Sequence, residues 1–235
     1  MGLPIQKAPT FRCKLSDGKE VTFRPFLVKE QKYLLLAKEG KNSEEVLNAT
    51  RELIQSVTNG KVNSDKLIMA DLEYLFLQIR SKSIGESAEL KLYCQKPGCG
   101  GNGGVKVDLS AVNIKFPEEV VDSTIKLSET LGVTLRHLTA RQLAKTDDIE
   151  NEGDKMVYLL KHGIESIYDA ETVYDTDDIQ DDELTEFVES LTLEQVDNLN
   201  TFFENVPSLQ HTVEYKCDSC GTLNESTLKG LQSFF

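Results

Sequence analysis

The sequence predicts an α+β fold in which helices pack on short antiparallel strands, with a four-cysteine, zinc-ribbon-like element formed by two sequence-distant knuckles. Three observations lead to this prediction. Several segments carry apolar residues at helical spacing, other short segments alternate apolar and polar residues, and two cysteine pairs lie in glycine-containing turns far apart in the chain. With 235 residues the chain is long enough to bury a sizeable core, and we expect a single composite domain over residues 1–235.

The N-terminal part is expected to form a β-hairpin with its turn at Asp17-Gly18, because Asp-Gly between alternating segments is a strong hairpin signal. Residues 17–86 are otherwise predicted to be mainly helical. Apolar periodicity predicts helices at 28–39, from 42 or 43 to Asn59-Gly60, and from 65 or 71 to 83. The packing face of the third helix consists of Leu72, Leu75, Phe76 and Ile79.

The chain then changes to strands around the two cysteine turns. Alternation predicts these strands at 88–93, 105–109, 112–116 and 209–216. The segments 88–116 and 209–227 together form the predicted zinc-ribbon-like element.

Between these segments, a hairpin at 123–138 is expected to precede a mainly helical region, 139–206. Two runs there, Thr139 to Gln142 and Thr192 to Gln195, have the form of a capping box, in which the two side chains satisfy backbone N–H groups at a helix start. The acidic run from Tyr174 is expected to be a solvated loop. Further helices are predicted at 153–162, 182–190 and 193–205.

Four of the five cysteines form the two pairs. Cys217 and Cys220 have the tight Cys-x-x-Cys spacing followed by glycine, whereas four residues separate Cys94 from Cys99. Two such thiolate pairs make a closed tetrahedral site with four cysteine ligands. We therefore predict that Cys94, Cys99, Cys217 and Cys220 bind one structural Zn²⁺ ion.

A disulfide framework and a set of unrelated thiols are the other interpretations of these cysteines. Disulfides need an oxidising compartment, and the sequence shows no basic and apolar signal segment. Catalysis by the metal is disfavoured because four cysteines leave no coordination position open to water or substrate. The fifth cysteine, Cys13, alternates with strand-like residues and is most simply a small buried side chain.

The net charge of the chain indicates which classes of partner it can bind. The formal net charge is −13 and the pI is about 4.8, which disfavours a surface built to neutralise phosphates and favours basic protein partners. No stretch is long and apolar enough to span a bilayer. We therefore expect no nucleic acid and no membrane span.

No catalytic constellation is evident in the sequence. The histidines are scattered, and none has a neighbouring Ser, Cys or carboxylate that would suggest a nucleophile and its base. They are His137, His162 and His211. The run Gly98 to Gly103 fits the letters of a dinucleotide fingerprint, but a strand is expected after it where that fingerprint needs a helix. We expect neither an enzyme nor a small-molecule substrate.

Two runs carry a resemblance to a known family. Phe23 to Ala37 is a strand ending in Pro-Phe that passes directly into a Lys/Glu-rich, Leu-rich helix, and Asp71 to Glu86 is a helix leading to the first cysteine turn. With the Cys-x-x-Cys strand and the aromatic end from Leu231 to Phe235, these runs resemble the T4-like bacteriophage baseplate family. The likeness covers most of the chain in order, and its motifs are patterns of fold.

The resemblance implies a component of the baseplate hub or central spike, either built into the particle or acting as a hub-assembly chaperone. It implies other phage baseplate or hub proteins as partners and the host cytoplasm as the place of assembly. The virion tail baseplate is the expected location if the protein is built into the particle. It transfers no catalytic residues.

The residues themselves also favour a non-enzymatic binding or assembly protein. The alternative is a zinc-ribbon nucleic-acid-binding or regulatory module, which would need a basic face. A hydrolase or thiol enzyme using Cys13 is a third class, for which the sequence supplies no base.

Overall fold

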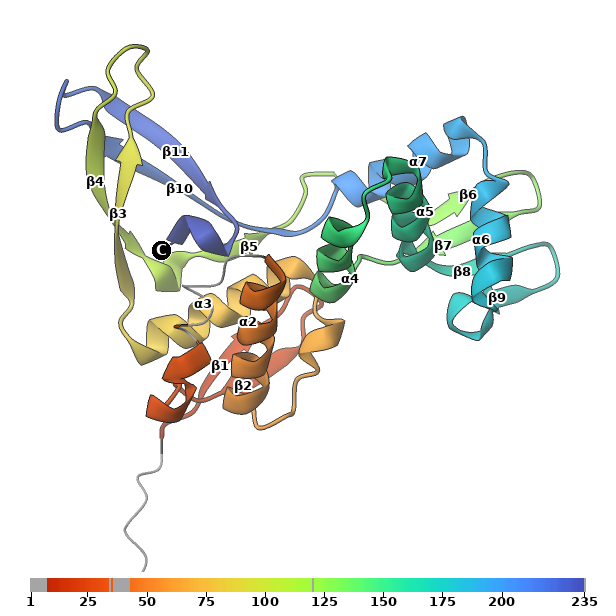
Figure 1. Ribbon diagram of the computed structural model, residues 1–235, viewed down its shortest axis with the longest axis horizontal. Coiled ribbons are helices and arrows are strands. Elements are labelled where there is room, and N and C mark those ends of the chain that lie inside the picture. The colour runs from red at the N-terminus through yellow and green to blue at the C-terminus, as the bar shows by residue number, and fades with distance from the viewer. Residues whose placement is uncertain (1–7, 34, 36–42, 120, 235) are drawn as a thin grey trace, which may run out of the picture. The chain divides into compact units, whose positions relative to one another are not determined.

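The helices and strands divide between two units that the chain visits in the order one, two, one. The computed structural model describes residues 8–33, 35, 43–119 and 121–234 (Figure 1). Unit 1 comprises the chain up to Lys115 and again from Pro207, and unit 2 is Phe116–Val206. The contacts within the chain divide it into these two units. That residues 1–235 fold together as one composite domain stays a prediction.

Unit 1 begins with the predicted hairpin. Strands β1 (Phe11–Lys14) and β2 (Glu20–Phe23) pair antiparallel, and Gly18 in their turn has φ 84°, a left-handed conformation that favours glycine. The 3-10 helix η1 (Val28–Glu30) follows. Of the helix predicted at 28–39, residues 31–33 and 35 are helical, and 34 and 36–39 lie outside the described residues.

The next two predicted helices are confirmed as α2 (Ser43–Val57) and α3 (Met69–Ser83), with the short η2 (Ser64–Lys66) between them. Asn59 and Gly60 end α2 in left-handed conformations, with φ 53° and 70°. The predicted packing face of α3 is buried, as are its neighbours, because this helix lies at the centre of the unit: Leu72, Leu75, Phe76 and Ile79 are each at most 2% exposed.

Two long hairpins complete unit 1. Strands β3 (Ser87–Tyr93) and β4 (Asn102–Asp108) form the first, and β10 (Ser208–Lys216) and β11 (Leu223–Lys229) form the second. The hairpins stand side by side in Figure 1. A core shared with α3, η3 (Leu109–Ala111) and η6 (Leu231–Phe234) includes Leu77, Leu90, Val107, Val213, Leu228 and Phe234.

Unit 2 is inserted at one point of a strand ladder. The chain leaves unit 1 after β5 (Asn113–Lys115) and re-enters it at β10, and Lys115 pairs directly with Ser208. The first and last residues of unit 2 are therefore held close together by the pairing within unit 1. Such adjacent ends are the usual condition for an inserted domain.

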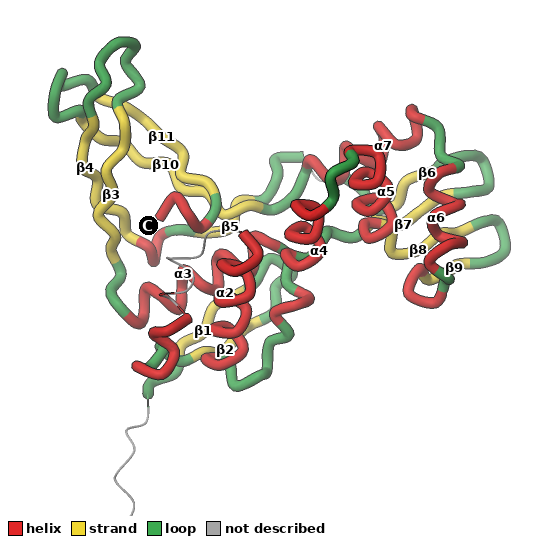
Figure 2. Tube along the Cα trace, in the orientation of Figure 1, coloured by secondary structure: helices red, strands yellow, loops and turns green. Residues whose placement is uncertain are grey.

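A four-stranded antiparallel sheet and several helices make up unit 2 (Figure 2). Its strands are β6 (Thr124–Lys126), β7 (Gly132–Leu135), β8 (Ile164–Tyr168) and β9 (Val173–Asp175), in that order across the sheet. Its helices are α4 (Ala140–Lys145), η4 (Thr146–Asp148), α5 (Glu152–Gly163), η5 (Thr176–Asp178), α6 (Asp181–Glu189) and α7 (Leu193–Glu204).

The helix starts in unit 2 follow the sequence closely, whereas two strands were missed. Thr139 and Thr192 form the predicted capping boxes, each accepting the N–H of the glutamine three residues later. The region predicted to be mainly helical also contains β8 and β9, and β9 overlaps the start of the acidic run expected to be a loop. The α+β fold class is confirmed, and the described helices include none long and apolar enough to cross a membrane.

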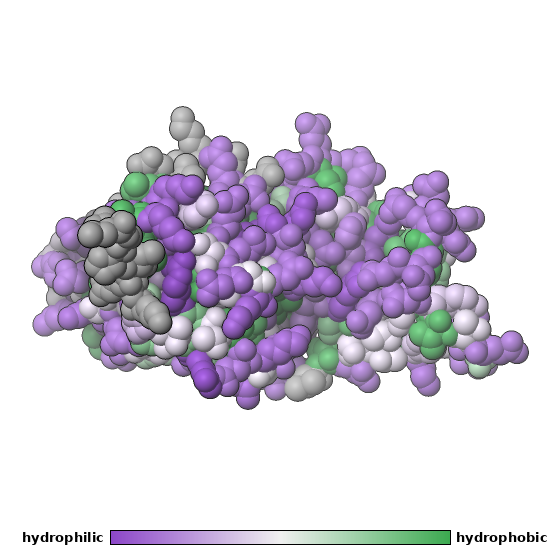
Figure 3. Space-filling view, turned by 90° about the horizontal axis from the view of Figure 1, so that it is seen from below, coloured by the Kyte–Doolittle hydropathy of each residue, from purple (hydrophilic) through white to green (hydrophobic). Residues whose placement is uncertain are grey.

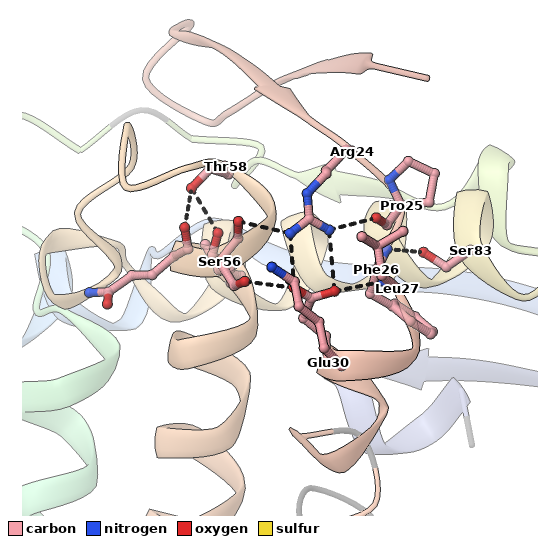
Figure 4. Close-up of polar contacts among 11 residues, drawn as sticks. Arg24, Pro25, Phe26, Leu27, Glu30, Ser56, Thr58 and Ser83 are labelled. Atoms are coloured by element: carbon pink, nitrogen blue, oxygen red, sulfur yellow. Dashed lines mark hydrogen bonds and ion pairs between the residues drawn. The ribbon is translucent and has the colours of Figure 1, made fainter. Parts of the chain in front are cut away.

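A buried ion pair joins three elements of unit 1 (Figure 4). Glu30 is 1% exposed, and its carboxylate accepts hydrogen bonds from the guanidinium of Arg24 at 2.8 and 3.2 Å. It also accepts the Leu27 N–H at 2.6 Å and the Ser56 hydroxyl at 2.8 Å. The donors come from the residue after β2, from the start of η1 and from the end of α2, so the pair ties these three segments together.

We predict that Glu30→Gln lowers the free energy of unfolding at neutral pH by about 3 kcal/mol, because it leaves the buried Arg24 charge without its counter-ion. Lys29→Ala is the matched control. Lys29 lies 3.4 Å from Glu30 but its side chain is 68% exposed, so its loss costs at most about 1 kcal/mol. Urea unfolding of the three proteins measures both values, and equal effects of the two substitutions would contradict the prediction.

The same pair predicts a pH dependence. Although burial raises the pKa of Glu30, hydrogen bonds from Arg24, Leu27 and Ser56 lower it to about 2, below its ordinary value of 4.5. A depressed pKa contributes stability that is fully present above 4.5 and is lost as the pH falls towards 2. Between these pH values the wild type should lose more stability than Glu30→Gln, as measured by urea unfolding at each pH.

Candidate metal centre

The two cysteine pairs lie at the ends of the two long hairpins of unit 1. Cys94 and Cys99 are in the turn between β3 and β4, and Cys217 and Cys220 are in the turn between β10 and β11. Left-handed glycines shape both turns, with φ 75° at Gly98 and 72° at Gly221. A residue with a Cβ is strained in this conformation, so the glycines allow each chain to fold back sharply beside its cysteines.

The four sulfur atoms converge on one point. All four Sγ atoms lie within 4.8 Å of one another. The Cys94 Sγ is 3.7 Å from that of Cys220, and the Cys99 Sγ is 3.8 Å from that of Cys217. Zn–S bonds of about 2.3 Å in a tetrahedron place sulfurs about 3.8 Å apart, so the cluster has the dimensions of a four-thiolate metal site. The structure thus brings together all four of the cysteines predicted to bind the metal.

These distances also distinguish the cluster from a disulfide framework. A disulfide joins sulfurs at about 2.0 Å, and all five cysteines of the chain are free. The sulfur–sulfur contacts at 3.7 and 3.8 Å each join opposite hairpins. The sulfurs therefore connect the two hairpins, and they do so through a shared centre.

Backbone hydrogen bonds hold each turn and join the two together. The Cys94 N–H donates to the Gly101 carbonyl at 2.8 Å, and the Cys217 N–H donates to the Thr222 carbonyl at 2.9 Å. Between the turns, the Asp218 N–H donates to the Asn102 carbonyl at 2.9 Å. The ligand positions are thus fixed by the backbone as well as by the sulfurs.

Asn224 is a residue of the site that the sequence did not reveal. Its side chain, 6% exposed, accepts the Gln95 N–H at 2.9 Å and donates to the Thr222 carbonyl at 2.9 Å. The Gln95 side chain in turn donates to the Glu225 carbonyl at 2.8 Å. These bonds connect the two turns. Sequence spacing could not show them, because only the pairing of distant hairpins brings Gln95 and Asn224 together.

Two glycines of the first hairpin permit the close approach of the second. A Cβ on Gly101 would lie 2.6 Å from the Ser219 Oγ and 3.0 Å from the Cys217 Sγ. A Cβ on Gly103 would lie 2.3 Å from the Lys216 carbonyl oxygen, which belongs to the backbone and cannot turn aside. Only glycine therefore fits at the contact between β4 and β10.

The environment shifts the acidity of two thiols of the cluster in opposite directions. Hydrogen bonds with Thr222 lower the pKa of the Cys220 thiol to about 6. The Gly101 N–H lowers the pKa of Cys99, but hydrogen bonding with Cys220 and burial outweigh it and raise that pKa to about 11. Neighbouring thiolates repel one another, so a cation at the centre is what allows all four to lose their protons.

The other candidate residues lie away from this cluster. Cys13 is in β1, opposite Val21. Burial, and to a smaller extent the negative charge of Asp71, raises the pKa of its thiol to about 12. Such a thiol is a poor nucleophile at neutral pH. His211 pairs with Leu228 along the second hairpin, and no histidine belongs to the metal-binding group found among the described residues.

A family model described as T4 bacteriophage base plate protein matches residues 8–235 of the chain. The match includes both cysteine turns and both units. No curated protein and no solved structure gives a significant match.

We predict that Gly103→Ala weakens metal binding at the cluster and lowers the melting temperature, because its Cβ would force β4 away from β10. Gly104→Ala is the matched control, since a Cβ on Gly104 meets nothing within 4 Å. Titration with a competing chelator and thermal melting measure the two effects. Equal behaviour of the two variants would show that the close approach of the hairpins does not support the site.

Proposed function

Because the chain belongs to the T4 bacteriophage base plate protein family, we propose that it is a non-enzymatic component of the baseplate hub, or central spike, or a factor that assembles it. It acts through contacts with other phage baseplate proteins. The observation that carries this proposal is the family match over residues 8–235. The four-cysteine cluster supports a non-enzymatic role, because a metal ion held by four thiolates would have no ligand position left for a substrate. The protein works in the host cytoplasm during assembly and, if it is a hub component, afterwards in the virion tail.

Zn²⁺ is the ion that this donor set fits best. Four thiolates at tetrahedral spacing are typical of structural zinc sites, and Cys94, Cys99, Cys217 and Cys220 supply them. The ion would connect two hairpins that are joined through unit 2 in the sequence. Its role is to stabilise unit 1, since metal binding is linked to folding when the ligands come from distant segments.

Charge supports a role in protein contacts. Residues 116–206, which form unit 2, contain 23 Asp and Glu but only six Lys and Arg, a net charge of −17. The remainder of the chain, which carries the cysteine hairpins, therefore has a net charge of +4. The face of the molecule in Figure 3 is mainly hydrophilic, with hydrophobic residues in small separate groups. Such a surface suits polar contacts with charged partners.

A zinc-ribbon nucleic-acid-binding module is the second candidate, and the separation of charge is the observation that favours it. The total of −13 disfavours nucleic acid for the whole chain, but the hairpins belong to the unit whose charge is +4. DNA binding that weakens steeply with salt, measured by fluorescence anisotropy, would support this candidate. Its absence at low salt would exclude it.

We predict that the tagged protein, recovered from infected cells at successive stages of assembly, brings other tail proteins with it. Mass spectrometry identifies these partners, and the same measurement on purified particles shows whether the protein stays in the tail. A hub component is found at both stages, whereas an assembly factor is found only before completion. Recovery without any tail protein would contradict the proposed function.

We predict that Cys217→Ser lowers both zinc content and soluble yield, because three thiolates hold the ion less well and folding is linked to metal binding. Cys13→Ser is the control for loss of a thiol outside the cluster, and its zinc content should equal that of the wild type. Elemental analysis and thermal melting check the result. Full solubility and an unchanged melting curve in Cys217→Ser would show that the site does not stabilise the fold.

A further inference from the structure

We propose that the outer edge of β9 in unit 2 accepts an extended, lysine- or arginine-rich segment of a partner protein as an additional strand. This inference rests on the proposed function, because it names one surface through which a baseplate protein would contact its neighbours. It concerns residues that the metal centre does not use.

The backbone of β9 is available on one side. The strand pairs with β8 and is the last in its sheet, and no strand in the described part of the chain pairs with its outer side (Figure 1). The turn before it is closed by the Asp169 N–H, which donates to the Thr172 carbonyl at 3.0 Å. Since facing and outward groups alternate along an antiparallel ladder, Tyr174 faces β8 and the N–H and C=O groups of Val173 and Asp175 point outward.

The side chains of this edge are also exposed. All residues from Asp169 to Asp175 are exposed, and Val173 and Tyr174 are 70% and 44% exposed. The hairpin is nevertheless well held, because Asp169 accepts the N–H groups of Glu171 and Thr172 at 2.8 Å each and the Tyr174 hydroxyl at 3.0 Å. An ordered edge strand with outward backbone groups and exposed apolar side chains is a template for a further strand.

Charge determines which strand can be added. The edge is flanked by exposed carboxylates at Asp169, Glu171, Asp175, Asp177 and Asp178. Arg136 pairs with one of them, Asp177, at 3.1 Å. Two copies of this edge would bring like charges together, and unit 2 of each copy carries a net −17, so pairing between copies is disfavoured. A strand with Lys or Arg between its apolar residues meets no such repulsion and matches the carboxylates.

The test uses the full-length protein and two synthetic peptides of equal charge, one alternating Lys and Val and the other alternating Lys and Pro. The Lys/Val peptide can add a strand, whereas proline at every second position removes half of the N–H donors and holds φ at about −65°, which disfavours strand geometry. We expect the Lys/Val peptide to bind at least about tenfold more tightly, the equivalent of one or two hydrogen bonds. Hydrogen exchange should show new protection at Val173 and Asp175.

Variants of Val173 test the position. Val173→Pro removes one outward N–H and leaves the pairing with β8 in place, and we expect about a tenfold weaker affinity for the Lys/Val peptide. Val173→Ala, the control, keeps the N–H and should bind within about threefold of the wild type. Val173→Lys repels the peptide without altering the backbone, and it serves if the melting curve shows that Val173→Pro is misfolded.

The inference is overturned if the two peptides bind equally, if neither binds, or if Val173→Pro and Val173→Lys both bind like the wild type. The proposed function is scored separately, by recovery of tail proteins with the wild-type protein from infected cells. If wild type and Val173→Lys recover the same tail proteins in equal amounts, the β9 edge is not the contact and the proposed function stands. If the wild type recovers none, the proposed function fails whatever the peptides do.

Discussion

The meeting of four sulfur atoms is the constraint on which unit 1 depends. Cys94 and Cys220 are 126 positions apart, yet their sulfurs lie 3.7 Å from each other. The entropy cost of closing so long a loop grows only with the logarithm of its length, so a metal ion bound by the four sulfurs would be able to offset it. The glycines at the contact let the backbones of the two hairpins come close together, and the buried Asn224 joins them by a hydrogen bond. A metal ion bound by these sulfurs would therefore act on the same contact as the glycines and the hydrogen bonds.

The insertion of unit 2 follows from this arrangement. Lys115 and Ser208 pair across neighbouring strands of unit 1, which means that unit 1 can close its own sheet whatever lies between these residues. Unit 2 has its own core, which includes Val133, Leu160 and Leu199, and it can carry an acidic surface without placing that charge among the elements of unit 1. The cysteine cluster thus belongs to unit 1, and most of the negative charge belongs to unit 2.

The sequence predicted those features whose signal is local. The capping boxes at Thr139 and Thr192, the periodic face of α3 and the cysteine turns each lie within a few residues of chain, and the structure contains all of them. The sequence did not predict features that depend on distant partners. β9 has only three residues and overlaps the start of an acidic run, and its strand conformation comes from pairing with β8. Asn224 likewise becomes part of the site only when Gln95 is brought to it.

The buried Arg24–Glu30 pair gives a structural reason for one of the sequence runs that resemble the family. Both residues lie in the Pro-Phe run that carries the family likeness, and in the sequence they look like ordinary surface charges. In the structure Glu30 is enclosed by donors from three elements, and its charge costs free energy unless all of them are in place. A pattern that places Arg, Pro and Glu at this spacing therefore specifies how a strand turns into a helix. In the cysteine turns, too, the spacing of a few residues specifies a local geometry, which holds the two hairpins of unit 1 together. The proposed contacts with partners lie on other surfaces, such as the β9 edge.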